Sequence, residues 1–320
     1  MEKQMYGIGE TFGIKADTAA TVPGFKVDPA SPTAQFVPAV DSSYKFTTES
    51  LRDILAWVKL SDIGLLENEG FLSFGPKGAG KTSLILQVAA RLGVPVIEVT
   101  GHGRLEVEDL LGRNTVVGGD ILFQDGPFTT AARLGCWVLI NEIDAIDPSQ
   151  QVGLNSLAER RPFLIPQTGE TVVPHPDFRV LATANTNLAG DSNGAFAGTQ
   201  RQNSAFADRF MFSECGYPSP DAELEIIQAL VPGLPPELAK VLIKVANVVR
   251  KHYVESELDI TLSTRSLVRW GKLTWAFSKA AGIGSPVVYA MHRAFGFQSD
   301  SDSRVILEEI LQRVLQEEGA

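Results

Sequence analysis

The sequence GPKGAGKT, running from Gly75 to Thr82, matches the phosphate-loop pattern G-x-x-x-x-G-K-[ST] at every fixed position. A short apolar run, residues 71–74, leads into it, and an amphipathic stretch, residues 82–92, follows it. The local order is therefore strand, loop and helix, which is the context in which this pattern is informative. We expect the loop to hold the phosphates of a nucleotide.

Each residue type in the loop suits that task for a physical reason. Gly75, Gly78 and Gly80 let backbone N–H groups turn inward, where a Cβ would clash or force a costly φ. Lys81 brings a positive charge for the β- and γ-phosphates, and Thr82 brings a hydroxyl that can ligate Mg²⁺. The first turn of the helix adds unsatisfied N–H groups and a positive dipole end. The predicted nucleotide contacts are Gly75, Pro76, Lys77, Gly78, Ala79, Gly80, Lys81, Thr82 and Ser83.

A second motif follows the apolar run 136–140, which predicts a buried parallel strand. This run ends in Asn141 and Glu142, the arrangement of a Walker B motif, and Glu142 is the candidate for polarising an attacking water. Asn141 stands where an aspartate usually lies near Mg²⁺. Its amide oxygen can accept a hydrogen bond from a metal-bound water but brings no charge. We therefore expect weakened Mg²⁺ binding, unless Asp144 or Asp125 lies near enough to compensate.

Further polar residues fall where a nucleotide site could use them. Asn185 follows the predicted strand 178–182 and suits a side chain that contacts the γ-phosphate or orients the water; Asn187 is its rival, and either could be a turn residue. Arg209 lies close to a helix end, and Arg265 lies at the start of a later helix. A guanidinium there could neutralise charge on the γ-phosphate, from a neighbouring subunit or a lid, or could form a surface ion pair.

The composition limits the class of protein. The chain has 320 residues, of which 44% are apolar, enough for about two domains. Its net charge of −10 argues against a general nucleic-acid or anionic-membrane surface. The two cysteines, Cys136 and Cys215, indicate no disulfide framework, and the four histidines have no metal-ligand spacing. Neither a membrane-spanning apolar run nor an apolar signal core is evident, so we expect a cytoplasmic protein.

The pattern along the chain predicts three regions. Residues 1–45, rich in Gly, Pro, Ser and Thr, are expected to form an extended arm that docks through its scattered apolar side chains. Residues 46–217 are expected to form an α/β nucleotide-binding domain with a parallel sheet, carrying hairpins at 115–123 and 163–173. Residues 218–320 show four or five helical patterns and predict a smaller all-helical domain.

Taken in order, these motifs resemble AAA+ ATPases of the MoxR clade, and within it the small ATPase subunits of aerobic cobaltochelatases, the CobS-like group. The general likeness rests on GPKGAGKT, WVLINEID (137–144), VLATANTN (180–187), ADRF (207–210) and LSTRSL (262–267). The likeness to the subgroup rests on GETFGIKADTAATVPGF (9–25), PHPDFRVLATANT (174–186) and GxxxGTQ (194–200).

The resemblance implies an ATP-driven, Mg²⁺-dependent ring, usually of six subunits, with nucleotide held between neighbours. It implies a lid role for the helical domain, and it places the two hairpins as a helix-2 insert and a pre-sensor-1 hairpin facing the central pore. It also implies a partner with a von Willebrand factor A domain and a larger client such as a chelatase subunit. The implied roles are Walker A for Lys81 and Thr82, Walker B for Glu142, sensor 1 for Asn185, arginine finger for Arg209 and sensor 2 for Arg265. The clade has aspartate at the position of Asn141.

Three functions remain open on the sequence. The first is an ATP-hydrolysing motor that remodels or activates a protein partner, for instance a chelatase inserting cobalt or another metalloenzyme. The second is a nucleotide-gated assembly module whose turnover is slow because of Asn141. The third is a nucleic-acid translocase or loader that uses basic pore residues such as Arg104 and Arg113, against which the acidic composition argues.

Overall fold

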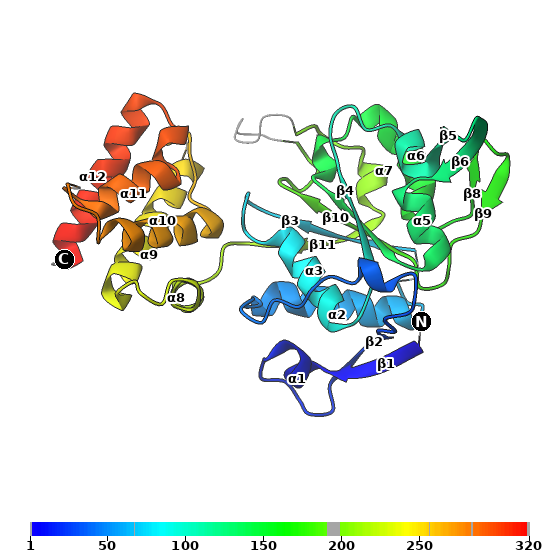
Figure 1. Cartoon of the computed structure of the whole chain (residues 1–320), viewed down its shortest axis with the longest axis horizontal. Coiled ribbons are helices and arrows are strands. Elements are labelled where there is room, and N and C mark those ends of the chain that lie inside the picture. The colour runs from blue at the N-terminus through cyan, green and yellow to red at the C-terminus, as the bar shows by residue number, and fades with distance from the viewer. Residues whose placement is uncertain (1, 67, 191–198, 256, 283, 319–320) are drawn as a thin grey trace. The chain divides into compact units, whose positions relative to one another are not determined.

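The computed structural model describes residues 2–66, 68–190, 199–255, 257–282 and 284–318 (Figure 1). The chain divides into two compact units, each described here by itself. The first unit contains residues 1–41, 46–75 and 80–215, and the second contains residues 42–45, 76–79 and 216–320. No helix in the described ranges is long and apolar enough to cross a membrane.

The first unit is built on a five-stranded sheet in which every neighbouring pair is parallel, with the strand order β11-β3-β10-β7-β4. Its strands are β3 (Gly70–Phe74), β4 (Val96–Thr100), β7 (Trp137–Asn141), β10 (Arg179–Ala184) and β11 (Phe210–Glu214). Four of these strands fall where the apolar runs predict them. The fifth, β11, is not predicted, because its sequence FMFSE is short and is apolar only over its first three residues. The predicted α/β fold with a parallel sheet is confirmed.

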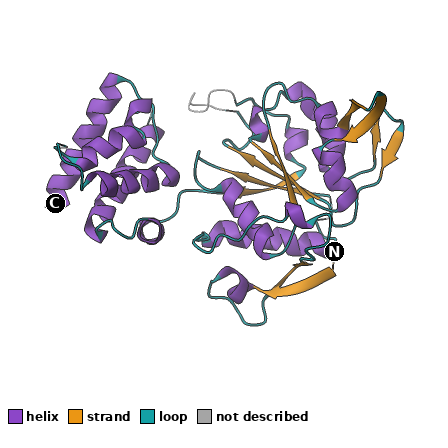
Figure 2. Ribbon diagram, in the orientation of Figure 1, coloured by secondary structure: helices purple, strands orange, loops and turns teal. Residues whose placement is uncertain are grey.

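Alternate residues of the central strands enter two separate cores, as expected for a sheet buried on both faces. Phe71 and Leu139 pack in the core that contains α2 (Thr48–Asp62) and α3 (Lys81–Arg91). Their neighbours Leu72, Val138 and Ile140 pack in the opposite core. The helices on that side are α4 (Val107–Leu111), α5 (Pro127–Leu134) and α6 (Pro148–Ala158). Figure 2 shows the strands as a layer between helices.

Both predicted hairpins are present as antiparallel pairs. The first joins β5 (Gly112–Val117) to β6 (Asp120–Asp125), and Gly118 and Gly119 turn the chain with positive φ values. The second joins β8 (Phe163–Ile165) to β9 (Glu170–Val172).

The first 45 residues are more regular than the extended arm that the sequence predicts. Strands β1 (Glu2–Gly7) and β2 (Thr21–Lys26) form an antiparallel pair around the short helix α1 (Ile8–Phe12), and a 3₁₀ turn, η1 (Ala34–Phe36), follows. The expected docking through apolar side chains is confirmed, because Phe12, Val22 and Phe25 are buried in the core shared with α2 and α3. The alternation of small and polar residues obscures the strand period in the sequence.

The described part of the second unit contains helices and a 3₁₀ turn, as the periodicity predicts. Its elements are α8 (Pro220–Leu230), α9 (Pro236–Val254), α10 (Thr264–Phe277), α11 (Pro286–Ala294), η3 (Gly296–Gln298) and α12 (Ser301–Glu318). Their apolar faces enclose one core around Trp270. Two further elements of the first unit are η2 (Ile143–Ala145), which follows β7, and α7 (Ser204–Ala207), which precedes β11.

Candidate functional site

The phosphate loop connects β3 to α3 and has a backbone that few residues except glycine adopt. Gly75, Gly78 and Gly80 have φ values of 145°, 75° and 102°. A Cβ added at Gly75 would overlap the carbonyl oxygen of Cys215. No side chain caps the N-terminus of α3, which begins directly after Gly80. The N–H groups and positive dipole end of α3 therefore face the loop, as an anion site requires.

Lys81 is buried, with 9% of its surface exposed. Its ammonium group donates to the carbonyl oxygen of Gly75 at 2.8 Å and to Oδ1 of Asn185 at 3.1 Å. Burial, the largest effect, lowers the pKa of Lys81, while the negative charges of Asp144 and Glu142 act to raise it. The two oxygens that accept from Lys81 here are neutral. A phosphate would stabilise this buried cation further, because an anion offsets the cost of burial better than a carbonyl does.

Asn141 links the phosphate loop to the end of the sheet. Its Oδ1 accepts a hydrogen bond from the Thr82 hydroxyl at 2.7 Å and from the Thr183 hydroxyl at 3.2 Å. The same Thr183 oxygen accepts from the backbone N–H of Glu142 at 3.2 Å. The amide oxygen thus acts as an acceptor beside Thr82. Thr183, on β10, lies within the VLATANTN motif, but it is an uncharged residue that the sequence gives no separate role.

The other end of the Asn141 amide faces a carboxylate. Its Nδ2 donates to Oε2 of Glu98 at 3.1 Å. Glu98 lies on β4, which pairs with β7 in the sheet. Glu98 belongs to none of the motifs, although one signal is present: it is the charged residue in the otherwise apolar strand sequence PVIEV.

The two carboxylates expected to compensate for Asn141 have other roles. Asp144 is fully buried, and its Oδ2 accepts from the backbone N–H groups of Asn185 and Thr186 at 2.8 and 3.0 Å. It therefore shapes the turn after β10. Asp125, at the end of β6, forms an ion pair with Arg133 at 2.8 Å. Their described contacts therefore link neither carboxylate to Thr82 or Asn141, although the negative charge of Asp144 acts on the nearby Lys81.

The structure separates the two candidate asparagines at the end of β10. Asn185 is partly buried and contacts Lys81. Asn187 is exposed, and its Oδ1 accepts from the backbone N–H of Ala189 at 3.2 Å, a bond typical of a turn. The geometry therefore favours Asn185. The GxxxGTQ stretch nearby lies largely outside the described residues.

Glu142 is exposed at the end of β7 and has a left-handed backbone conformation, with φ 56° and ψ 47°. This conformation costs a non-glycine residue about 1–3 kcal/mol and is concentrated at functional sites. The Thr183 hydroxyl holds the backbone N–H of Glu142 in this position. Glu142 thus directly follows β7, at the end of the sheet where β3 and β10 also finish, and its negative charge acts on Lys81.

Arg209 lies at the opposite end of the same sheet, where strands β3 and β11 begin. It precedes Phe210, the first residue of β11, and its carbonyl accepts from the N–H of Gly70, the first residue of β3. Its guanidinium bonds to the Ala205 carbonyl and forms an ion pair with Glu159 at 2.9 Å. A five-residue strand spans about 16 Å. Within one subunit, Arg209 and Lys81 therefore lie apart, at opposite ends of β3.

Arg265 is exposed in the first turn of α10, in the second unit. Beside it, Thr264 donates to Oε1 of Glu223 at 2.7 Å. Glu223 is fully buried and forms a two-bond ion pair with Arg250, at 2.7 and 2.9 Å. This buried pair ties α8 and α9 to the start of α10.

These residues fit a nucleotide with Mg²⁺. The loop glycines leave room for phosphate oxygens, Lys81 supplies a buried charge, and the Thr82 hydroxyl is oriented by Asn141. Lys81 and Thr82 would hold the phosphates and the metal, and Asn141 would act on the metal through a bound water. The chemistry of the donors is that of a hydrated hard cation beside phosphate.

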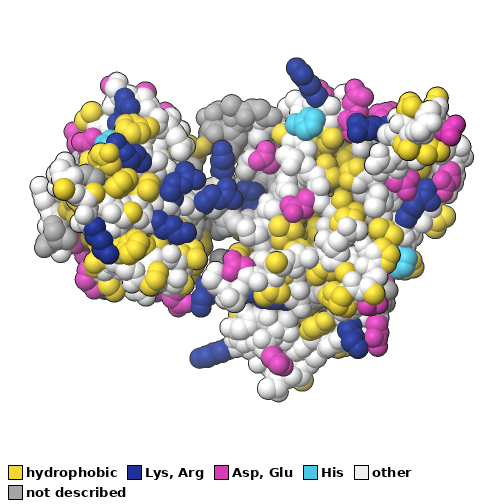
Figure 3. All heavy atoms as spheres, viewed as in Figure 1, with side chains coloured by type: hydrophobic (Ala, Val, Ile, Leu, Met, Phe, Trp, Pro, Cys, Tyr) yellow, Lys and Arg dark blue, Asp and Glu magenta, His cyan; other side chains and the backbone are white. Residues whose placement is uncertain are grey.

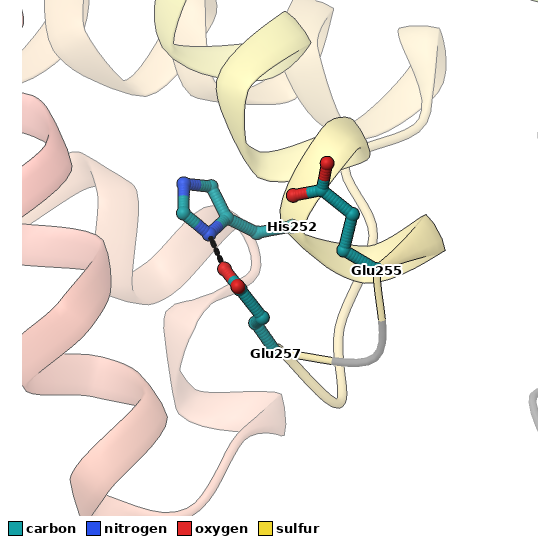
Figure 4. A group of neighbouring side chains, drawn as sticks. All are labelled: His252, Glu255 and Glu257. Carbon is teal, nitrogen blue, oxygen red and sulfur yellow. Dashed lines mark hydrogen bonds and ion pairs between the residues drawn. The ribbon is translucent and has the colours of Figure 1, made fainter.

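A second group of ligand-type side chains lies at the end of α9. The ligand atoms of His252, Glu255 and Glu257 fall within 4.8 Å of one another, and His252 Nδ1 is bonded to Glu257 (Figure 4). The backbone N–H of Glu257 also donates to the His252 carbonyl at 2.8 Å. The pair is explained as a cap on the carboxyl end of the helix.

Two family models match this chain. Residues 70–210 match the AAA domain (dynein-related subfamily), and residues 223–314 match the CbbQ/NirQ/NorQ C-terminal domain. The chain is similar to aerobic cobaltochelatase subunit CobS of Sinorhizobium sp, with 30% identity over 96% of this chain and 89% of that protein. It is also similar to protein CbbQ of Hydrogenophilus thermoluteolus, with 30% identity over 74% and 84%. Protein NorQ of Paracoccus denitrificans shares 32% identity over 62% and 71%.

The predicted resemblance is therefore confirmed: the AAA domain, the C-terminal domain and these relatives cover nearly the whole chain. The AAA family implies the binding and hydrolysis of ATP, and in general the use of Mg²⁺. This chain belongs to the CobS-like AAA+ ATPases of the MoxR clade.

Proposed function

We propose that this protein is the ATP-hydrolysing motor of a ring of identical subunits, six in number, that remodels or activates a partner enzyme. The observation that carries the proposal is the separation of two sets of residues. Lys81, Asn141 and Asn185 meet where the strands of the sheet end, whereas Arg209 lies where they begin. An arginine finger in this position serves the nucleotide of a neighbouring subunit.

Within the site, each residue has a role that follows from its position. Lys81 binds the β- and γ-phosphates, and Asn185 contacts the γ-phosphate or the attacking water. Glu142 polarises that water, because it directly follows β7 and its charge acts on Lys81 in the same site. Thr82 would hold Mg²⁺, which would supply positive charge to offset that of the phosphates. Arg209 from the neighbour neutralises charge that develops on the γ-phosphate.

The proposed client is a protein. The hairpins present apolar side chains to solvent, namely Val116, Val117, Ile121, Leu122 and Leu164, and Val173 directly follows β9. Figure 3 shows hydrophobic atoms on the end of the first unit where the hairpins of Figure 1 lie. Exposed apolar patches of this kind are typical of protein contacts. Because CobS is named as a cobaltochelatase subunit, we infer that the client is a metal chelatase or another metalloenzyme. We also infer that a protein with a von Willebrand factor A domain binds the ring together with this client.

The ring is tested by mixing two inactive variants. Glu142→Gln removes the polarising carboxylate, and Arg209→Ala removes the finger; each alone should lose at least 100-fold in phosphate release. In a mixed ring, an Arg209→Ala subunit keeps Glu142 and can receive Arg209 from a Glu142→Gln neighbour. The mixture should therefore recover activity that neither variant has. If the mixture stays as inactive as its components, Arg209 does not act between subunits and the proposal fails.

Asn141 favours a second candidate function, a nucleotide-gated assembly module with slow turnover. Its amide supplies an oxygen to Thr82 but no charge. On this alternative, Asn141→Asp should raise the rate of phosphate release at least tenfold, while the wild-type rate is low. A brisk wild-type rate that Asn141→Asp leaves unchanged would exclude the slow module and favour the motor.

A further inference from the structure

The unexplained feature of the site is that Asn141 lacks a charge where this clade has aspartate. The neighbouring side chain at its amide nitrogen is Glu98, with Nδ2 to Oε2 at 3.1 Å. In the sheet, Glu98 pairs with Leu139 and Thr100 pairs with Asn141. Leu139 and Asn141 are two residues apart and so point to the same face, the face covered by α3. Glu98 therefore emerges on the side where α3 carries Thr82.

The hydrogen bonds of Asn141 can be assigned by chemistry alone. A carboxylate only accepts, so the Asn141 amide must turn its NH₂ toward Glu98. Its oxygen is then directed toward the Thr82 and Thr183 hydroxyls, at 2.7 and 3.2 Å. With the amide reversed, its NH₂ would face the hydroxyl that ligates the metal, and its oxygen would face a carboxylate. Glu98 thus selects the orientation in which the Thr82 hydroxyl donates to Asn141 and keeps both of its lone pairs free for a cation.

Glu98 also brings the charge that Asn141 lacks. Of the other nearby carboxylates, Asp144 is engaged in the turn after β10, Asp125 is paired with Arg133, and Glu142 is the proposed partner of the attacking water. In the described ranges Glu98 forms no ion pair, and its recorded partner is the amide of Asn141. Its charge is therefore not cancelled locally. The Glu98 carboxylate lies one hydrogen bond further from Thr82 than an aspartate at position 141 would. Its attraction for a cation beside Thr82 is therefore weaker, but it still acts because the site is partly desolvated.

We propose that Glu98 is a positioning residue for the Mg²⁺ side of the nucleotide site: it orients the Asn141 amide and supplies, from the adjacent strand, the negative charge missing at position 141. This inference rests on the proposed function, because it concerns the same nucleotide site. It makes Glu98 and Asn141 a joint substitute for one aspartate.

The test measures Mn²⁺ affinity by electron paramagnetic resonance, with full-length protein saturated with ATP. Glu98→Gln keeps an acceptor for the amide and removes the charge, and it should weaken Mn²⁺ binding about tenfold, as outer ligands of metal sites do. Glu98→Ala removes both and should weaken it at least as much. Glu309→Gln makes the same change on the exposed surface of α12 and should leave the affinity unchanged. ATP affinity in EDTA, which reports the phosphate loop alone, should stay within twofold for all variants.

The decisive variant moves the carboxylate to the adjacent strand. Glu98→Gln combined with Asn141→Asp restores one charge beside Thr82, so Mn²⁺ affinity should return to at least the wild-type value. If Glu98→Gln binds Mn²⁺ like wild type, or if the double variant binds no better than Glu98→Gln, the inference is overturned. These outcomes leave the proposed function intact as long as the wild-type ring hydrolyses ATP. A wild-type protein that binds no Mn²⁺–ATP would overturn both.

Discussion

Lys81 donates a hydrogen bond of 3.1 Å to Oδ1 of Asn185, which joins the phosphate loop to the end of a strand 104 residues further along the chain. The bond holds the buried ammonium in place while leaving the amide NH₂ of Asn185 free to donate to a phosphate or a water. It also distinguishes Asn185 from Asn187, whose side chain belongs to a turn.

Asn185→Ala should lower the rate of ATP hydrolysis about 100-fold and change ATP affinity by less than fivefold, since a donor used mainly in the transition state contributes mainly to the rate. Phosphate release and fluorescent-nucleotide binding check the two quantities. The matched control is Asn187→Ala, two residues further, which should keep nearly the wild-type rate. Equal losses in the two variants would contradict the assignment of Asn185.

Glu223→Ala should destabilise the helical unit by about 3–5 kcal/mol, because it leaves the buried Arg250 without a counter-charge. Hydrogen exchange of α8 to α10 in the full chain measures this loss. Replacing both residues together, as Glu223→Leu with Arg250→Met, should cost less than either single change, since no buried charge remains. Lys240→Ala, which removes an exposed pair on the same helix α9, should leave exchange unchanged. A double variant worse than both singles would count against this account.

Gly75→Ala should weaken ATP binding more than tenfold and destabilise the first unit, because the added Cβ meets the Cys215 carbonyl and the φ value is 145°. Urea unfolding and nucleotide titration provide the measurements. Gly169→Ala is the control, since its φ is 70° but open space surrounds it. It should cost only about 1 kcal/mol for the strained backbone. A Gly75 variant that behaves like the Gly169 variant would show that the loop relaxes freely.

Burial raises the pKa of the Cys136 thiol to about 12, from an ordinary value of 9.0. The folded chain therefore holds this proton more tightly than the unfolded chain, and the free energy of unfolding should fall as pH rises from 9.0 toward about 12. At pH 10 the loss should be about 1.4 kcal/mol relative to a Cys136→Ala variant, with urea unfolding at pH 7.5 as the reference for both. Rapid alkylation of Cys136 in the folded protein at pH 8 would disagree with this burial.

Much of the site could be predicted because its parts are local. The phosphate loop is one continuous segment, and Asn141, Glu142 and Asn185 each end an apolar strand, so the rule that parallel strands meet at their carboxyl ends brings them together. The structure places Asn141 and Asn185 beside Thr82 and Lys81, respectively.

Other features depend on contacts between strands and could not be read from spacing. Asp144 comes three residues after Asn141, yet it is buried and accepts hydrogen bonds from the turn after β10. Its position in the sequence does not reveal this contact. Glu98 lies 43 residues before Asn141, and it reaches the amide only because β4 and β7 are neighbours in the sheet. The two-stranded start of the chain is similar, since β1 and β2 need one another to form a sheet.

The sequence by itself determined the nucleotide, the parallel α/β fold, the helical second region and the family, because phosphate recognition and strand burial leave short, continuous patterns. Only the tertiary structure decided which carboxylate lies beside Asn141 and which asparagine contacts Lys81. It also decided that Arg209 lies at the opposite end of the sheet from the phosphate loop of its own subunit. The physical reason is that charge and hydrogen bonding act across a few ångströms of space, and strand order, which sets those distances, is fixed by packing between segments far apart in the chain.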